Sequence, residues 1–172
     1  MKSIIIFVLA LFVTSCAPIY VNYDYEKTAD FTQYKTYNYY KDLETGLSEL
    51  DTKRLLNSLD MSLQAKGFSK SETPDMFINI TSSEYIESQR STVGVGVGGT
   101  GGNVGGGISV GIPLGQSNVN RQITIDFIDE NGIGLIWQAI SETTYNPDAS
   151  PEKRQEKFKA IVDKVLSQYP PK

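Results

Sequence analysis

Cys16 is the only cysteine in this 172-residue chain, and its thiol is the most distinctive reactive group that the sequence offers. A lone cysteine cannot form a disulfide within its own chain, so the thiol needs another explanation. Small residues, Thr14 and Ser15, come directly before it, and an apolar run precedes them. This order favours covalent modification of the thiol beside a peptide bond that is cleaved.

The residues before Cys16 have the layout of a secretory signal peptide. Lys2 is positively charged, and residues 4–13 are apolar without interruption, well short of the ~20 residues that span a bilayer. Val13-Thr14-Ser15-Cys16 resembles a lipobox, at which a bacterial lipoprotein precursor is lipidated on cysteine and cut just before it. We predict a signal peptide over 1–15, cleavage between Ser15 and Cys16, and a lipidated cysteine with a short tether over 16–19.

The predicted anchor is a set of acyl chains, such as palmitate, on Cys16, because two or more chains hold a protein stably on a membrane. The residue after Cys16 is Ala17 and not an aspartate. This resembles the sorting pattern for delivery to the outer membrane, where the domain would face the periplasm. Two alternatives stay open. The apolar run could be a buried element of the fold, and Cys16 an ordinary small residue near a cleavage site.

The composition argues against most enzymes and against nucleic acid as a partner. The chain has no histidine, which removes the commonest general base and metal ligand, and an acylated Cys16 removes the thiolate. We expect no metal site, no catalytic residues and no cofactor beyond the covalent lipid. The net charge is −4, and the sequence has no stripe of basic residues that would bind nucleic acid. It also has no polybasic segment that would bind anionic lipid.

One enzymatic alternative survives, a hydrolase of an envelope polymer. It needs two convergent carboxylates in a cleft. Asp126, Asp129 and Glu130 are the candidates, although they lie on a strand face and a turn where solvated carboxylates are common.

Hydrophobic periodicity predicts an α+β fold in the order β-β-α-β-β-β-α, with a mostly antiparallel sheet and two helices packed on it. The domain is expected over residues 20–172. Ser48 and Gly67 bracket the first helix, and Ser150-Pro151 begins the second. The strand at 133–140 should bury Ile133, Leu135, Trp137 and Ala139 on one face. The predicted strands are 17–24, 34–40, 76–86, 119–128 and 133–140, and the helices are 48–66 and 151–169.

A glycine-rich segment separates the third and fourth strands. Residues 91–120 carry eleven of the chain's 15 glycines and no charge, and valine or isoleucine alternates with small residues at both ends. We predict a long hairpin over 91–117 whose apolar face contacts a protein partner, another copy or the membrane. A segment without a specific role is the alternative, and a phosphate loop is excluded because no lysine and no helix follow. The contact residues would be Val93, Val95, Val97, Ile108, Val110 and Ile112.

Aromatic residues have two interpretations. The five tyrosines between Tyr25 and Tyr40 fit the core and rim of a sheet better than a carbohydrate- or peptide-binding surface. Trp137, the only tryptophan, fits a core or rim position better than a ligand platform.

Several short motifs, taken in order, resemble the bacterial lipoprotein family that carries domain of unknown function 4136. The resemblance covers about Tyr20 to Pro171, and Tyr39-Tyr40 departs from it where many members have tryptophan. Family members often carry a valine- and glycine-rich stretch, and no activity is established for them. The motifs are Asp30-Phe31, Tyr34-Lys35-Thr36-Tyr37, Lys66-Gly67-Phe68, Pro74-Asp75, Asp129 with Leu135-Ile136-Trp137, and Tyr169-Pro170-Pro171.

These observations together predict a non-catalytic binding or scaffold module of the cell envelope, held by a lipidated Cys16. Its partner would be an envelope protein or a second copy of the chain. A self-assembling or membrane-contacting hairpin protein is the remaining alternative.

Overall fold

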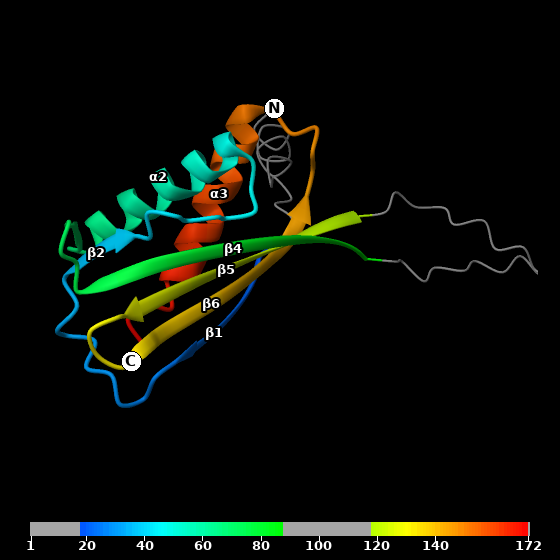
Figure 1. Cartoon of the computed structure of the whole chain (residues 1–172). Coiled ribbons are helices and arrows are strands. Elements are labelled where there is room, and N and C mark those ends of the chain that lie inside the picture. The colour runs from blue at the N-terminus through cyan, green and yellow to red at the C-terminus, as the bar shows by residue number, and fades with distance from the viewer. Residues whose placement is uncertain (1–17, 88–117, 172) are drawn as a thin grey trace, which may run out of the picture.

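The chain forms an α+β fold in which a six-stranded sheet carries two helices on one face (Figure 1). The computed structural model describes residues 18–87 and 118–171. The predicted order of long elements is confirmed, and one two-residue strand is added to it. The elements are β1 (Tyr20–Tyr25), β2 (Thr36–Tyr39), α2 (Glu49–Ala65), β3 (Ser69–Lys70), β4 (Met76–Glu87), β5 (Asn118–Asp129), β6 (Gly134–Tyr145) and α3 (Pro151–Leu166).

The sheet has the strand order β1-β6-β5-β4-β2-β3 and is mixed. β1, β6, β5 and β4 pair antiparallel, as predicted, whereas β2 pairs parallel with both β4 and β3. Parallel neighbours require a crossover connection, and α2 supplies it between β2 and β4. β3 was not predicted because two residues are too few to display an alternating pattern.

Four strand ends meet at one end of the sheet. Tyr20 at the start of β1 pairs with Glu142 near the end of β6, and Val119 near the start of β5 pairs with Tyr145. Glu87 at the end of β4 pairs with Asn118. We refer to this region as the Tyr145 end of the sheet.

Both helices begin, and α2 ends, at the residues whose chemistry predicts a boundary, whereas α3 ends at Leu166, three residues before the predicted end at 169. The Ser48 side chain accepts a hydrogen bond from the Asp51 amide at 3.3 Å, and Ser150 accepts one from the Lys153 amide at 3.4 Å. Gly67 has a φ of 90°, a left-handed conformation that favours glycine after a helix.

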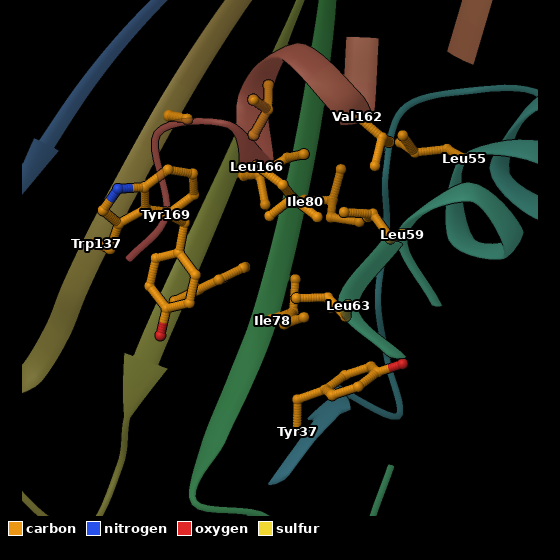
Figure 2. Close-up of a cluster of buried hydrophobic side chains, with 14 of the residues drawn as sticks. Tyr37, Leu55, Leu59, Leu63, Ile78, Ile80, Trp137, Val162, Leu166 and Tyr169 are labelled. Carbon is orange, nitrogen blue, oxygen red and sulfur yellow. The ribbon is translucent and has the colours of Figure 1, made fainter. Parts of the chain in front are cut away.

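The hydrophobic core lies between the helices and the sheet, and Figure 2 shows its central side chains. In Figure 2, Leu63 of α2 lies near Ile78 of β4, and Leu59 lies near Ile80. These side chains are on the side of the sheet that α2 and α3 cover. At the other side of the core, the centroid of the Tyr169 ring lies 5.2 Å from the centroid of the Trp137 ring and 4.7 Å from that of the Phe127 ring. Trp137 is therefore a core residue, as predicted.

The prediction that Ile133 and Leu135 share a buried face with Trp137 is wrong. Phe127 pairs with Trp137 but Ile128 pairs with Leu135, so Ile136 is an extra residue in β6. This β-bulge reverses the alternation, because one inserted residue shifts all the following side chains to the opposite face. Ile136 is fully buried, whereas Leu135 is 49% exposed and Ile133 is 51% exposed.

Candidate functional site

A buried carboxylate, that of Asp51, joins the first turns of both helices. Asp51 lies in the first turn of α2 and is only 1% exposed. Its amide donates to Oγ of Ser48 at the helix cap, and its carboxylate accepts hydrogen bonds from arginines. Nη1 of Arg54 lies 2.8 Å from Oδ1, and Nη1 of Arg154, from α3, lies 3.0 Å from Oδ2.

A third arginine reaches the same carboxylate from the sheet. Nη1 of Arg121, on β5, lies 3.6 Å from Oδ2 of Asp51, and its Nη2 lies 2.6 Å from Oε1 of Glu84. The guanidinium also lies 3.6 Å from the centroid of the Tyr145 ring. These five charged residues, Asp51, Arg54, Glu84, Arg121 and Arg154, are called here the Asp51 cluster; it holds three cations and two anions.

The Asp51 cluster borders a pocket at the Tyr145 end of the sheet, between β6 and α3. The pocket has a volume of about 370 Å³. Arg121, Arg154, Lys153 and Lys157 line it, and no carboxylate does. Phe158 and Ile161 of α3 supply apolar wall. We call this cavity the basic pocket; its remaining lining residues are Thr143, Thr144, Tyr145, Asn146 and Ala149.

Thr143 carries an unusual hydroxyl in the lining of the basic pocket. The residue is 6% exposed, and its Oγ1 has no hydrogen-bond partner among the described residues. A buried polar atom is costly without a partner, so an unpartnered one within a pocket indicates a place where a ligand atom can bind. The basic pocket thus combines positive charge, apolar wall and one hydroxyl.

This site was not predicted from the sequence, although one signal for it exists. Arg121 alternates with Ile123, Ile125 and Phe127, which places a charged side chain on the buried face of β5. Charged side chains are almost never buried without partners, so this position alone predicts an ion pair across the core.

The tyrosines belong to the core and its rim, as predicted. Tyr37 is buried, and its hydroxyl donates to Oδ1 of Asp60 at 2.9 Å. Tyr39 donates to the same oxygen at 2.8 Å, and Lys70 lies over the Tyr39 ring. Burial, together with the Asp60 charge, raises the pKa of both phenols. Tyr34 is also buried and donates to Asp129.

The acidic candidates for a hydrolase occupy separate hydrogen-bond networks. Asp126 accepts from Asn79 at 3.4 Å and Gln138 at 2.8 Å. Asp129 accepts from Tyr34 at 3.0 Å. Glu130 is exposed on the turn between β5 and β6. Each carboxylate therefore has a local structural explanation.

The remaining predicted site residues lie outside the part of the chain that the structure describes. They are Ser15 and Cys16 at the predicted cleavage and lipidation site, and Val93, Val95, Val97, Ile108, Val110 and Ile112 in the predicted contact hairpin. Within residues 18–87 and 118–171, no helix is both long and apolar enough to cross a bilayer. The same residues contain no grouping of three or more Asp, Glu, His or Cys side chains suited to a metal ion.

Comparison with known protein families identifies the family of this chain. The model described as "Domain of unknown function (DUF4136)" matches residues 21–171. The chain belongs to the DUF4136 family. This confirms the predicted family domain. A search of curated protein sequences finds no significant match.

Solved structures share the fold of this DUF4136 domain. A PDZ domain protein from Parabacteroides distasonis ATCC 8503 is similar with a TM-score of 0.56 and 16% identity, over 96% of this chain and 39% of that chain. The chain therefore spans well under half of that protein. The PelC dodecamer from Paraburkholderia phytofirmans is similar with a TM-score of 0.50 and 13% identity, over 87% of this chain and 96% of PelC. A variant PelC dodecamer gives a TM-score of 0.50 and 14% identity. At these sequence identities, the similarity shows a shared fold alone.

Proposed function

We propose that this protein is a lipid-anchored, non-catalytic binding module of the bacterial cell envelope. The observation that carries the binding role is the basic pocket, which is lined by four cationic side chains and no carboxylate. Cavities of about 300–1,000 Å³ with a mostly apolar wall and a few polar groups are typical of small-molecule sites. The lipobox at Val13–Cys16 supports the anchor and the envelope location.

The anchor is tested by mass analysis of the processed protein together with membrane fractionation. The expected mature chain begins at Cys16 and carries acyl chains on it, and it sediments with outer membranes. Cys16→Ser should abolish acylation and move the protein from the membrane fraction. Ser15→Ala, which keeps a small residue before the cut, is the matched control and should be processed normally. Detection of a mature protein whose Cys16 thiol is unmodified would contradict the proposed lipid anchor.

The binding role is preferred to hydrolysis because the candidate carboxylates occupy separate networks. Genes that encode Asp126→Asn or Asp129→Asn are therefore expected to complement a deletion strain as well as the intact gene does. Failure of a stably folded Asp126→Asn protein to complement the strain would favour the hydrolase instead. The readout is complementation of a deletion strain, with protein level checked by immunoblot.

Self-association is a second candidate, favoured by the fold similarity to PelC, whose structures are dodecamers. The predicted hairpin would supply the contact, through Val95 and its alternating neighbours. Native mass spectrometry should then detect oligomers that Val95→Asp dissociates. Deletion of residues 92–114 should leave the domain folded and abolish crosslinks to partners, and unchanged crosslinking would remove the hairpin from this role.

A further inference from the structure

We propose that the free edge of β1 binds an extended strand from a second copy of this chain, formed by its residues 93–97. The valines of that strand would lie opposite Val21, Tyr23 and Tyr25. The inference rests on the self-association candidate of the proposed function and deepens it, because it names the surface on which the glycine-rich segment docks.

β1 is the long open edge of the sheet (Figure 1). It pairs with β6 on one side, and among residues 18–87 and 118–171 no strand pairs with its other side. The opposite edge is β3, which has only two residues and contains Lys70. Short strands and lysines are typical protections of a sheet edge against further pairing. β1 has six residues and no lysine, so it lacks both protections.

Every second residue of β1 turns its backbone polar groups away from the sheet. Directly after β1, the Glu26 amide donates to the Ile136 carbonyl of β6 at 2.9 Å. Hydrogen-bonded pairs alternate along an antiparallel ladder, so the even-numbered residues of β1 also direct their amides and carbonyls at β6. The odd-numbered residues, Val21, Tyr23 and Tyr25, therefore direct theirs outward.

One of these outward amides is already occupied. Oδ1 of Asp24 accepts a hydrogen bond from the Tyr25 amide at 2.9 Å. Within the described part of the chain, this leaves the amides of Val21 and Tyr23, with the three outward carbonyls, for an added strand. Main-chain hydrogen bonds of this kind supply the affinity when a strand is added to a sheet edge.

A hollow beside this edge can receive side chains of the added strand. It has a volume of about 290 Å³ and lies between β1 and the residues that follow α3. Tyr23, which is 46% exposed, and Tyr25 form one wall, and the centroids of their stacked rings lie 6.5 Å apart. A residue opposite Tyr23 would point to the same face of the sheet, into the hollow. The other lining residues are Ser167, Gln168, Pro170 and Pro171.

Residues 93–97 match this edge in pattern and in charge. They read Val-Gly-Val-Gly-Val and lie within the uncharged segment 91–120. Because side chains alternate along a strand, all three valines would face the hollow, where pairs of β-branched and aromatic side chains are favourable. The glycines would face the other side of the sheet and bring no charge close to Asp24.

The geometry favours a second copy over the same chain. β4 ends at Glu87, and β5, β6 and β1 lie between it and the free edge. With ~4.8 Å between strands and ~3.3 Å per residue along them, the register places the position opposite Val21 about 25 Å from Glu87. The six residues from Glu87 to Val93 span at most about 22 Å. The position opposite Tyr25 is farther still, so Val93 of the same chain falls short in either strand direction.

Disulfide formation between two variants of the mature protein, in a non-ionic detergent, tests the pairing. Val95 is central among the three valines, so it lies opposite Tyr23 in either strand direction, with Cα atoms ~5.5 Å apart and within reach of a disulfide. Mixed Val95→Cys and Tyr23→Cys proteins should crosslink at least about fivefold more than Val95→Cys and Asn22→Cys, because Asn22 faces the other side of the sheet. Mass spectrometry locates the crosslink. Equal yields would overturn the pairing.

Native mass spectrometry of further variants tests the edge itself. Tyr23→Pro removes an outward amide and keeps the bonds to β6, and edge strands tolerate proline. Tyr23→Val, which keeps the amide, is the matched control. We expect oligomers for the parent and Tyr23→Val, and monomers for Tyr23→Pro and for Val95→Asp. An equal mixture of the two monomeric variants should form dimers, because one retains the edge and the other retains the strand.

Thermal denaturation checks that Tyr23→Pro is folded, and the disulfide experiment does not depend on that variant. Oligomers that Val95→Asp dissociates and folded Tyr23→Pro leaves intact would overturn this inference alone, since the glycine-rich segment would then associate through another surface. A parent protein that stays monomeric would overturn the self-association candidate as well.

Discussion

Oδ2 of Asp51 lies 3.0 Å from Nη1 of Arg154, although 103 residues separate them in the chain. The contact joins the first turn of α2 to the first turn of α3, the two helices that cover the sheet. Arg121 approaches the same carboxylate from β5. A single buried anion therefore connects three elements of the fold beside the basic pocket.

Replacing Asp51 by asparagine should destabilise the protein strongly. The change removes the anion and leaves three arginines close together in a poorly hydrated region. Loss of one partner from a buried ion pair costs about 3–5 kcal/mol. Urea denaturation followed by circular dichroism measures the free energy of unfolding.

Glu49→Gln is the matched control, because Glu49 is in the same helical turn and pairs with Lys53 at 2.6 Å but is 81% exposed. An exposed pair at this spacing contributes much less than a buried one, so Glu49→Gln should change the free energy of unfolding only slightly. Equal effects of the two substitutions would mean that the Asp51 cluster contributes no more than a surface pair.

Two buried tyrosines should respond differently to loss of their hydroxyl groups. The hydroxyl of Tyr37 donates to the Asp60 carboxylate at 2.9 Å, whereas that of Tyr169 lies 3.6 Å from Sδ of Met76. Tyr37→Phe should cost about 1–2 kcal/mol, because a hydrogen bond to a charged group is lost. Tyr169→Phe should be close to neutral, since sulfur is a weak acceptor. Thermal denaturation of both variants measures how much stability each one loses. A larger loss of stability for Tyr169→Phe than for Tyr37→Phe would contradict the prediction.

Asp75 should make stability depend on pH in the acid range. Its Oδ2 accepts hydrogen bonds from the Lys35 amide at 2.9 Å and the Thr36 amide at 2.8 Å, which connects the start of β2 to the start of β4. The amide of Lys35, then that of Thr36, holds the pKa of Asp75 below its ordinary value of 3.8. The charged form is therefore favoured in the folded state.

A lowered folded-state pKa contributes stability above the unfolded pKa, and this contribution is lost as the pH falls through the folded value. Asp75→Asn should therefore lower the urea midpoint at about pH 7 and have a much smaller effect at about pH 2. Measuring both midpoints for both proteins gives the comparison. A difference that stays constant between the two pH values would exclude a role for the Asp75 charge.

The sequence predicts the long elements because their signals are local. Ser48, Gly67 and Ser150 begin or end helices through their own backbone neighbours, and those boundaries are confirmed within a residue or two. The predicted end of β6 falls five residues short of Tyr145. Its buried positions there are Ser141 and Thr143, so burial continues where the apolar pattern stops.

The candidate site is not visible in the sequence because its members are far apart. Asp51, Glu84, Arg121 and Arg154 come from four elements. All of them except Arg121 have an ordinary local interpretation as a cap, a strand end or a helix surface residue. Only the tertiary fold brings their charges together. A charged residue on an apolar strand face, such as Arg121, is the one local signal of that arrangement.

The bulge in β6 gives a sharp test with two adjacent residues. A regular strand would bury Leu135 with Trp137, whereas the bulge buries Ile136 and leaves Leu135 half exposed. Ile136→Ala should therefore cost about 2–5 kcal/mol, and Leu135→Ala about 1 kcal/mol or less, because a cavity forms only at the buried position. Urea denaturation of the two variants measures this difference. The opposite ranking would show that β6 pairs without the extra residue, and would place Leu135 rather than Ile136 in the core.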